Sequence, residues 1–462
     1  MKPKYFLALG LLVLGLGSCG ESFFEQYPSN NITEGNFYKT DDDFNQGVVA
    51  CYAKLKTQMS FHLTEIGYRG DENVLESMAV STQNRYDIDH FAETANNGIL
   101  NDIWNAWYNG IYRCNDVLDH MTGAKIANYD KYRGECLFLR SWWYFNFYRV
   151  FGVVPITRTV VTPAAAKLIP RCTEEEMYTL LTEDLAEAAR LLPPTPGPEK
   201  ARVANIAAYT LLAKVYLTFG KPAEAKTALE EAMKNTSYGL ESTTKKVFDV
   251  GNKMNREIIF ALYYNKTNDN GHGYWCSANT DVLADINNPT PTFKAIYDSE
   301  KDNRLPLISS YTKIKDNLFA MTKWYDTYDA TYTTQVGNDF PHLRYADVVL
   351  MYAEALAESG GSLGDALEWL NKTRTRAGLD ELTTDEVKSL AEFRRELAAE
   401  RGREFALEGH RWFDLVRLGL AVDYFREMGY SLDSHNLIFP IPQNQIEIVN
   451  NPSILWQNPG FN

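Results

Sequence analysis

Two segments of the chain carry the same pattern, in which two amphipathic helices are joined at a glycine. In residues 203–234 the apolar positions recur every three or four residues on both sides of Gly220. In residues 344–378 the same spacing flanks Gly360 and Gly361. A helix with one apolar face must bury that face against another element. The pattern therefore predicts helical hairpins that pack on one another.

The same periodicity predicts further helices earlier in the chain, at residues 101–120, 131–150 and 173–192. The hairpins resemble tetratricopeptide units of about 34 residues, but they do not follow one another in tandem. A plain solenoid is therefore a poor fit. We expect a mostly α protein, with tetratricopeptide-like helical hairpins forming one scaffold, long irregular insertions and a few short strands.

Two stretches have the composition of such insertions. Residues 60–90 are polar and irregular, and residues 238–342 mix Asn, Asp, Gly and Thr with many aromatic side chains. Within the second stretch, residues 257–264 (EIIFALYY) predict a strand. Long loops on a rigid scaffold are where binding functions usually lie. We therefore expect ligand contacts from these two insertions.

The N-terminus predicts export and lipid attachment. Two lysines precede an apolar run at residues 5–17, which is too short to span a bilayer core of about 30 Å. These features indicate a secretory signal at residues 1–18. Residues 16–19 (LGSC) resemble a bacterial lipobox, in which Cys19 becomes acylated and is the first residue of the mature chain. A diacyl-type anchor (palmitate is a common acyl group) would make membrane attachment stable.

Composition narrows the classes of ligand and cofactor. The chain has 60 acidic against 46 basic residues and a formal charge of −14, which weighs against a nucleic-acid partner. The other cysteines are widely spaced with no C-x-x-C, and the seven histidines have no ligand spacing. We therefore expect no metal, no cofactor and no disulfide framework, although an exported chain could form one disulfide.

Residues 392–417 interleave Arg with Glu in the phase of the apolar stripe of one predicted C-terminal helix. Burial of an unpaired charge costs several kcal/mol. The alternatives are a solvated face or the carboxylate pair of a glycosidase, whose two acids stand about 5 to 9 Å apart. We favour a structural ion-pair network, because adjacent Arg lowers the pKa of the acids, the reverse of what a general acid needs. Its predicted members are Arg401, Arg403, Glu404, Glu408, Arg411 and Asp414.

Residues 400–417 (ERGREFALEGHRWFDLVR) closely resemble the signature of the SusD/RagB outer-membrane lipoproteins. Gly402 stands where a second Arg is common in that signature, and Cys136 where Ala is usual; neither departure threatens the fold. Further segments match in the family's order along nearly the whole mature chain: 36–40, 113–115, 134–140, 151–155, 344–347, 353–355, 374–378, 439–442 and 457–460.

The resemblance implies a cell-surface protein, lipid-anchored in the outer membrane, that captures oligosaccharides and caps a TonB-dependent transporter, a SusC-like β-barrel. Such proteins bind and do not catalyse. RagB-type members handle peptides, so a peptide-binding partner of the same kind of transporter stays open, and a glycosidase is a distant alternative. The expected division is a signal peptide at 1–18, an N-terminal region of helical pairs at 19–240, and a C-terminal region with insertion loops and signature helix at 241–462.

The resemblance transfers no ligand residues, since the shared motifs lie in the scaffold. Sugars present apolar C–H faces to aromatic rings, while Arg, Asn and Asp form hydrogen bonds with the hydroxyls. We therefore predict contacts from aromatic side chains and their polar neighbours in both insertions. In the first insertion these are Tyr68, Arg69, Asp71, Asn73, Arg85 and Tyr86. In the second they are Tyr274, Trp275, Trp324 and Tyr325.

Overall fold

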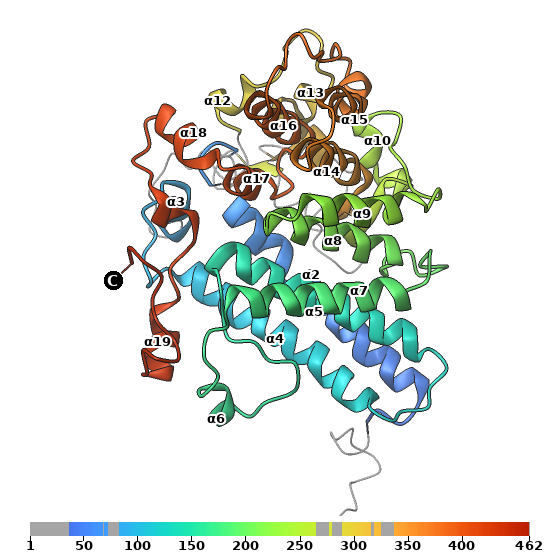
Figure 1. Ribbon diagram of the computed structural model, residues 1–462, viewed down its shortest axis with the longest axis vertical. Coiled ribbons are helices and arrows are strands. Elements are labelled where there is room, and N and C mark those ends of the chain that lie inside the picture. Colours follow the sequence, from blue (N-terminus) through green and yellow to red (C-terminus); the bar gives the residue numbers. More distant parts are fainter. Residues whose placement is uncertain are drawn as a thin grey trace, which may run out of the picture.

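The computed structural model describes residues 37–67, 69–72, 83–264, 277–279, 289–315, 318–324 and 337–461. Its main body is a stack of antiparallel helices, in which each helix contacts the next one in the series α2, α4, α5, α7, α8 and α9, then α14, α15 and α16. Figure 1 shows this stack running from α2 and α4 at one end to α15 and α16 at the other. The predicted helical scaffold is confirmed.

The lower half of the stack contains the longer helices: α2 (Asp41–Gly67), α4 (Gly98–Met121), α5 (Tyr129–Phe151) and α7 (Glu174–Leu191). Helix α5 is buried along almost its whole length, as its wide apolar arc predicts. Thr173 and Glu176 form the capping box that opens α7. Arg140 of α5 donates two hydrogen bonds to Asp184 of α7 and one to Asn115 of α4, so that a buried polar group ties three helices together.

The upper half contains the two hairpins recognised from the sequence. These are α8 (Asn205–Thr218) with α9 (Pro222–Met233), and α14 (Tyr345–Glu358) with α15 (Leu363–Arg376). Gly220 and Gly360 both have positive φ, at 67° and 82°, which a turn between antiparallel helices favours. Helix α9 packs directly on α14, so the two hairpins are continuous in space despite the long segment between them.

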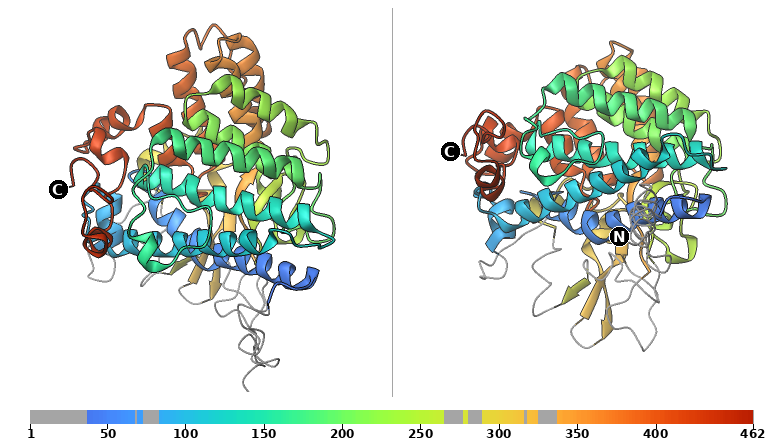
Figure 2. Two further views of the ribbon diagram at one scale, coloured as in Figure 1. Left: turned by 60° about the horizontal axis from the view of Figure 1, so that its bottom comes forward. Right: turned by 90° about the horizontal axis from the view of Figure 1, so that it is seen from below.

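One small sheet joins the early part of the segment between the two hairpins to its end. Strand β1 (Ile258–Leu262) pairs antiparallel with β5 (Phe340–Arg344), and β5 leads straight into α14. A second sheet has the order β2-β4-β3, with β2 at Ser277–Asn279, β4 at Leu318–Met321 and β3 at Tyr311–Lys315. Figure 2 shows this second sheet projecting from one side of the helical body. The strand predicted at 257–264 is confirmed as β1.

Two expectations from the sequence need correction. The stretch 60–90 is not wholly irregular, because α2 continues to Gly67 and α3 occupies Gln83–Asp89. The single helix predicted over 392–417 is two helices, α16 (Leu390–Glu404) and α17 (Arg411–Arg417), separated by a turn at 405–410. The break is encoded at Leu407 and Gly409, which have φ values of 62° and 76°.

The remaining helices are short or lie along one flank. They are α6 (Pro163–Ala166), α10 (Thr244–Val247), α12 (Pro291–Lys294), α13 (Leu305–Ser309), α18 (Ala421–Glu427), α19 (Gln443–Val449), η2 (Val250–Asn252), η3 (Thr322–Trp324) and η4 (Ser434–Leu437). Within the described parts of the chain, no helix has both the length and the apolar character needed to span a bilayer. Cys51, Cys114, Cys136 and Cys172 are free and buried.

Candidate ligand-binding region and the signature turn

The turn at 405–410, here called the signature turn, anchors both insertions. Glu72, in the first insertion, accepts a hydrogen bond of 2.7 Å from the backbone N–H of Leu407. Lys323, in the short helix η3 that follows β4 in the second insertion, donates to the carbonyl of Ala406 and, at 2.7 Å, to Glu408. One six-residue turn therefore contacts residues of both insertions and ties them to the C-terminal helices.

A buried cluster of charges surrounds Arg344, the last residue of β5. Its guanidinium makes ion pairs of 2.7 Å with Glu257, 2.6 Å with Glu404 and 2.8 Å with Glu408. Arg376 also pairs with Glu257 and Glu404, and Arg304 links Glu404 to Glu400. These contacts join β5, α15, α16 and the residue just before β1, so that the base of the second insertion is tied to the C-terminal helices.

A second buried cluster lies one helix turn away, around Arg401. Arg401 bonds Asp347 of α14 at 2.8 Å and Asp414 of α17 at 2.7 Å. Asp347 also pairs with Lys214 of α8, and Asp414 with Arg417 at 2.9 Å. The cluster therefore connects α8, α14, α16 and α17.

The two remaining members of the predicted network lie at its edges. Arg403 pairs with Glu400 at 3.1 Å and donates to the carbonyl of Ile296. Arg411 pairs with Asp71 at 3.1 Å. All six side chains predicted for the network thus take part in buried ion pairs. A Cβ on Gly402 would stand 3.1 Å from Nη1 of Arg411, so little room remains there for the larger residue common in the signature.

The electrostatics of the clusters favour structure over acid catalysis. The guanidinium groups of Arg376, Arg344 and Arg304 hold the pKa of Glu404 well below its usual range despite burial. Arg401 and Arg417 do the same to the pKa of Asp414. A glycosidase general acid must stay protonated near neutral pH, which requires a raised pKa. These two carboxyl groups are instead buried and held as anions.

Three of the residues predicted to contact ligand are core residues in the structure. Arg69 and Asp71 have no exposed surface, and Trp324 is 1% exposed. Arg69 pairs with Glu93 and stacks on aromatic rings, whereas Asp71 holds Arg411. Trp324 packs edge-on against Phe248. Because a ligand reaches no atom of these side chains in this conformation, the structure assigns them to the scaffold.

Of the other predicted contacts, two lie in the described part of the chain. Arg85 and Tyr86 are half-buried on α3, and the Tyr86 ring stacks on His90 with centroids 3.8 Å apart. Both therefore remain predictions. The others lie outside the described residues, as does the lipidation site Cys19: Tyr68, Asn73, Tyr274, Trp275 and Tyr325.

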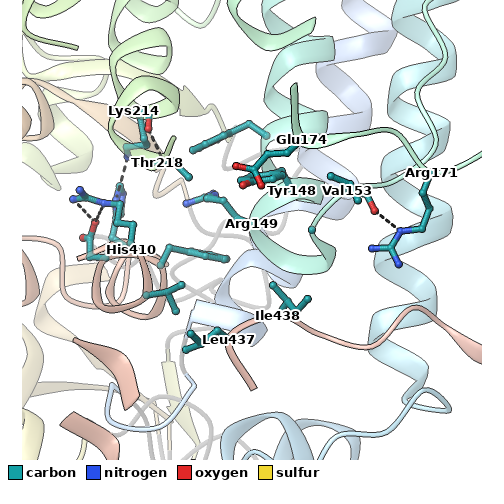
Figure 3. A pocket seen from close by; sticks show the side chains of 16 residues that line it. Tyr148, Arg149, Val153, Arg171, Glu174, Lys214, Thr218, His410, Leu437 and Ile438 are labelled. Atoms are coloured by element: carbon teal, nitrogen blue, oxygen red, sulfur yellow. Dashed lines mark hydrogen bonds and ion pairs between the residues drawn. The ribbon is translucent and has the colours of Figure 1, made fainter. Parts of the chain in front are cut away.

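Sequence reasoning missed a cavity of about 500 Å³ that opens between α5, α8, α17 and the start of α7. Figure 3 shows Arg149 extending into it, with Lys214 and His410 on one side and Tyr148 and Glu174 on the other. The signal was present in the sequence, since Arg149 is a charged residue near the end of a helix that is apolar on several sides. The other residues that line the cavity include Phe145, Gly152, Val153, Arg171, Thr218, Phe413, Asp414, Arg417, Leu437 and Ile438.

The fold defines a class of protein, a scaffold of tetratricopeptide-like helical hairpins with two insertions anchored on it. Two family models match this chain: one described as the SusD family over residues 303–461, and one described as starch-binding and associating with the outer membrane over residues 27–217. The chain belongs to the SusD/RagB family.

Individual relatives agree with this assignment. SusD-like protein P2 of Formosa agariphila is 25% identical over 99% of this chain and 100% of its own length. The starch-binding protein SusD of Bacteroides thetaiotaomicron is 33% identical over 31% of this chain and 26% of its own length. The structure of surface glycan-binding protein A from Bacteroides thetaiotaomicron in complex with laminarihexaose has a TM-score of 0.74 and 22% identity, covering 91% of this chain and 100% of that one. This last likeness concerns the fold.

Proposed function

We propose that this protein is a glycan-binding lipoprotein of the outer-membrane surface, which captures oligosaccharides and presents them to a TonB-dependent transporter. The observation that carries the proposal is the match of residues 27–217 to a family described as starch-binding and associated with the outer membrane. The proposal assigns binding to the protein and no catalytic step.

The names of similar proteins support the carbohydrate part of the proposal. One relative is named a starch-binding protein, and one structure of the same fold is of a surface glycan-binding protein in complex with laminarihexaose. The signature turn adds a physical reason. Because it holds Glu72 of the first insertion and Lys323 of the second, both insertions are tied to the rigid scaffold.

The predicted contacts in the second insertion give a direct test of the binding site. In the full-length lipoprotein, purified in detergent, Tyr274→Ala and Trp275→Ala should each weaken binding to the best-bound oligosaccharide by about tenfold, as loss of a stacking ring does. The matched control is Trp369→Ala, which removes a half-buried ring on α15 that packs against Tyr352. Isothermal titration calorimetry with starch and laminarin oligosaccharides measures the change.

Three outcomes would contradict the proposal in different parts. Unchanged affinity in both loop variants would move the glycan site elsewhere on the protein. Binding to peptides but to no oligosaccharide would favour the RagB-like function. Release of new reducing ends from a bound glycan would make the protein an enzyme. The transporter role requires that a large β-barrel protein co-purifies with the tagged lipoprotein from outer membranes.

A further inference from the structure

The cavity around Arg149 is large enough for a small ligand. Its volume of about 500 Å³ lies within the range of small-molecule sites. Aromatic side chains of Phe145, Tyr148 and Phe413 form part of its wall. Four basic side chains also line it, against two acidic ones, in a protein whose formal charge is −14. The lining of the cavity is therefore net positive, whereas the whole chain is net negative.

Two of these four basic side chains are neutralised by the protein. Lys214 pairs with Asp347, and Arg417 pairs with Glu354 and Asp414. Arg401, behind the cavity, shares Asp347 and Asp414 with them. Three cations therefore meet three carboxylates, and this part of the wall is electrically balanced.

Arg149 is not balanced in this way. Its guanidinium lies 4.0 Å from the centre of the Phe413 ring and 4.7 Å from that of Phe145, and it donates to the amide oxygen of Asn146. Among the residues that the structure describes, no carboxylate forms an ion pair with it, and its Nε is buried without a hydrogen-bond partner. Burial lowers the pKa of Arg149 to about 9, which means that the fold disfavours this charge.

Arg171, at the edge of the same cavity, also lacks a carboxylate in the described structure. It donates to the carbonyls of Val153 at 2.7 Å and Trp456 at 2.8 Å, and to the side chain of Asn458. These neutral acceptors fix the guanidinium in place but leave its charge uncompensated. Two guanidinium groups without an ion-pair partner among the described residues thus add positive charge to one cavity. Glu174 at the exposed rim opposes this charge, as do Asp414 and Asp347, which lie beyond ion-pair distance of Arg149 but act to raise its pKa.

The cavity also offers neutral groups that suit sugar hydroxyls. His410 is held uncharged, because burial and Lys214 lower its pKa well below the usual value. Nδ1 of His410 lies 3.4 Å from Nζ of Lys214 and accepts from the ammonium group, which leaves Nε2 to carry the proton. The hydroxyls of Tyr148 and Thr218 are further neutral groups, and the charged carboxylate of Glu174 can accept hydrogen bonds.

We propose that this cavity binds an acidic sugar residue, one bearing a carboxylate or a sulfate ester, with its anionic group on Arg149. This inference rests on the proposed function for its sugar component and adds the charge class of the ligand. The anion would supply the missing partner of Arg149, and planar guanidinium groups match carboxylate and sulfate geometry. The hydroxyls of the sugar would then meet His410, Tyr148 and Glu174.

The test uses the full-length lipoprotein in detergent and four probes: oligogalacturonate, galactose 6-sulfate, inorganic sulfate and neutral laminarihexaose. Arg149→Gln should weaken binding of at least one acidic sugar by about tenfold or more, since it removes a charged hydrogen-bond donor. Its affinity for the neutral oligosaccharide should not change. The matched control is Arg190→Gln, which removes the same charge from an exposed position on α7 outside the cavity.

Thermal unfolding shows whether a variant that loses binding is still folded. Because Arg149 is a half-buried cation with no ion-pair partner among the described residues, Arg149→Gln should keep or raise the melting temperature while it removes the upward shift caused by the acidic sugar. Arg149→Lys should recover part of that shift.

Each result bears on the inference separately from the proposed function. If every acidic sugar that binds the wild type binds equally well to Arg149→Gln, the assignment of the cavity is overturned. Wild-type protein that binds only neutral glycans would overturn the charge class but leave the proposed function standing. Inorganic sulfate binding as tightly as the acidic sugars would reject the sugar component. Failure of all glycans, acidic and neutral, would count against the proposed function itself.

Discussion

Gly67, the last residue of α2, lies directly against Gly409 in the signature turn. A Cβ placed on Gly67 would stand 2.6 Å from the Cα of Gly409, closer than side-chain carbons approach backbone atoms. Both residues are buried. The end of the first long helix and the turn that anchors the insertions therefore meet backbone to backbone, which only glycine permits at this position.

We expect Gly67→Ala to destabilise the protein by about 1–3 kcal/mol, because backbone cannot move aside as a flexible side chain can. Urea denaturation followed by circular dichroism measures this change. The control is Gly364→Ala in the exposed first turn of α15, where the nearest atom to a new Cβ is Oγ of Ser362 at 3.3 Å. That change should be neutral or slightly stabilising, since Ala favours helix more than Gly does. Equal effects at both positions would refute the close contact.

Arg344→Met should cost about 3–5 kcal/mol, because it leaves Glu257, Glu404 and Glu408 without one of their buried cations. The same substitution at Arg133, whose ion pair with Glu187 is about one-third exposed, should cost less than about 1 kcal/mol. Chemical denaturation of both variants gives the comparison. A small loss at Arg344 would mean that the cluster adds little to stability.

Glu72 gives the protein a predicted dependence of stability on pH. Burial and the neighbouring Asp71 raise the pKa of Glu72 to about 8 from an ordinary value of 4.5. The folded state therefore keeps a proton that the unfolded chain loses, so the free energy of unfolding falls as pH rises from about 4.5 to about 8. Below this window the stabilisation is fully present.

Glu72→Gln should remove that dependence while its amide oxygen still accepts the Leu407 N–H. We expect the variant to be more stable than the wild type by about 1–3 kcal/mol at pH 8, and to differ little at pH 5. Denaturant midpoints at the two pH values test this. A difference that is the same at both would show that Glu72 does not titrate in this window.

Cys19→Ala should release the protein from the membrane, because the acyl chains supply the stable attachment. In cells that process lipoproteins, the wild type should sediment with the outer membrane and the variant should appear in the soluble fraction. Intact-mass spectrometry should find added acyl groups only on the wild type. The melting temperature should be the same for both, since Cys19 precedes the helical body. A variant that stays membrane-bound without acylation would reject the lipid anchor.

Helix periodicity and turn residues could be read from the sequence because they are local. The capping box at Thr173, the turn at Gly220 and the strand at 257–264 all depend on neighbours within a few residues, and the structure has each of them. The break of the signature segment at 405–410 was missed, since the apolar and charged pattern continues across it in helical phase.

The candidate ligand residues were harder to predict because composition does not reveal burial. The chemistry of sugar-binding side chains is present in Arg69, Asp71 and Trp324. In the structure, however, the two charged residues form ion pairs with Glu93 and Arg411, respectively, and the Trp324 ring packs against Phe248. Each of these partners lies more than twenty residues away in the chain. Conversely, the sequence shows Arg149 only as one charge on an apolar helix, and it is the packing of its guanidinium on Phe413 of α17 that places it without an ion pair among the described residues.

The sequence by itself determined the helical hairpins, the family and the presence of paired charges in the signature, because short-range spacing and local motifs encode all three. The tertiary structure decided that α9 packs on α14, that one turn holds both insertions, and which charges are neutralised. Those outcomes depend on contacts between segments far apart in the chain, whose energies no local pattern records.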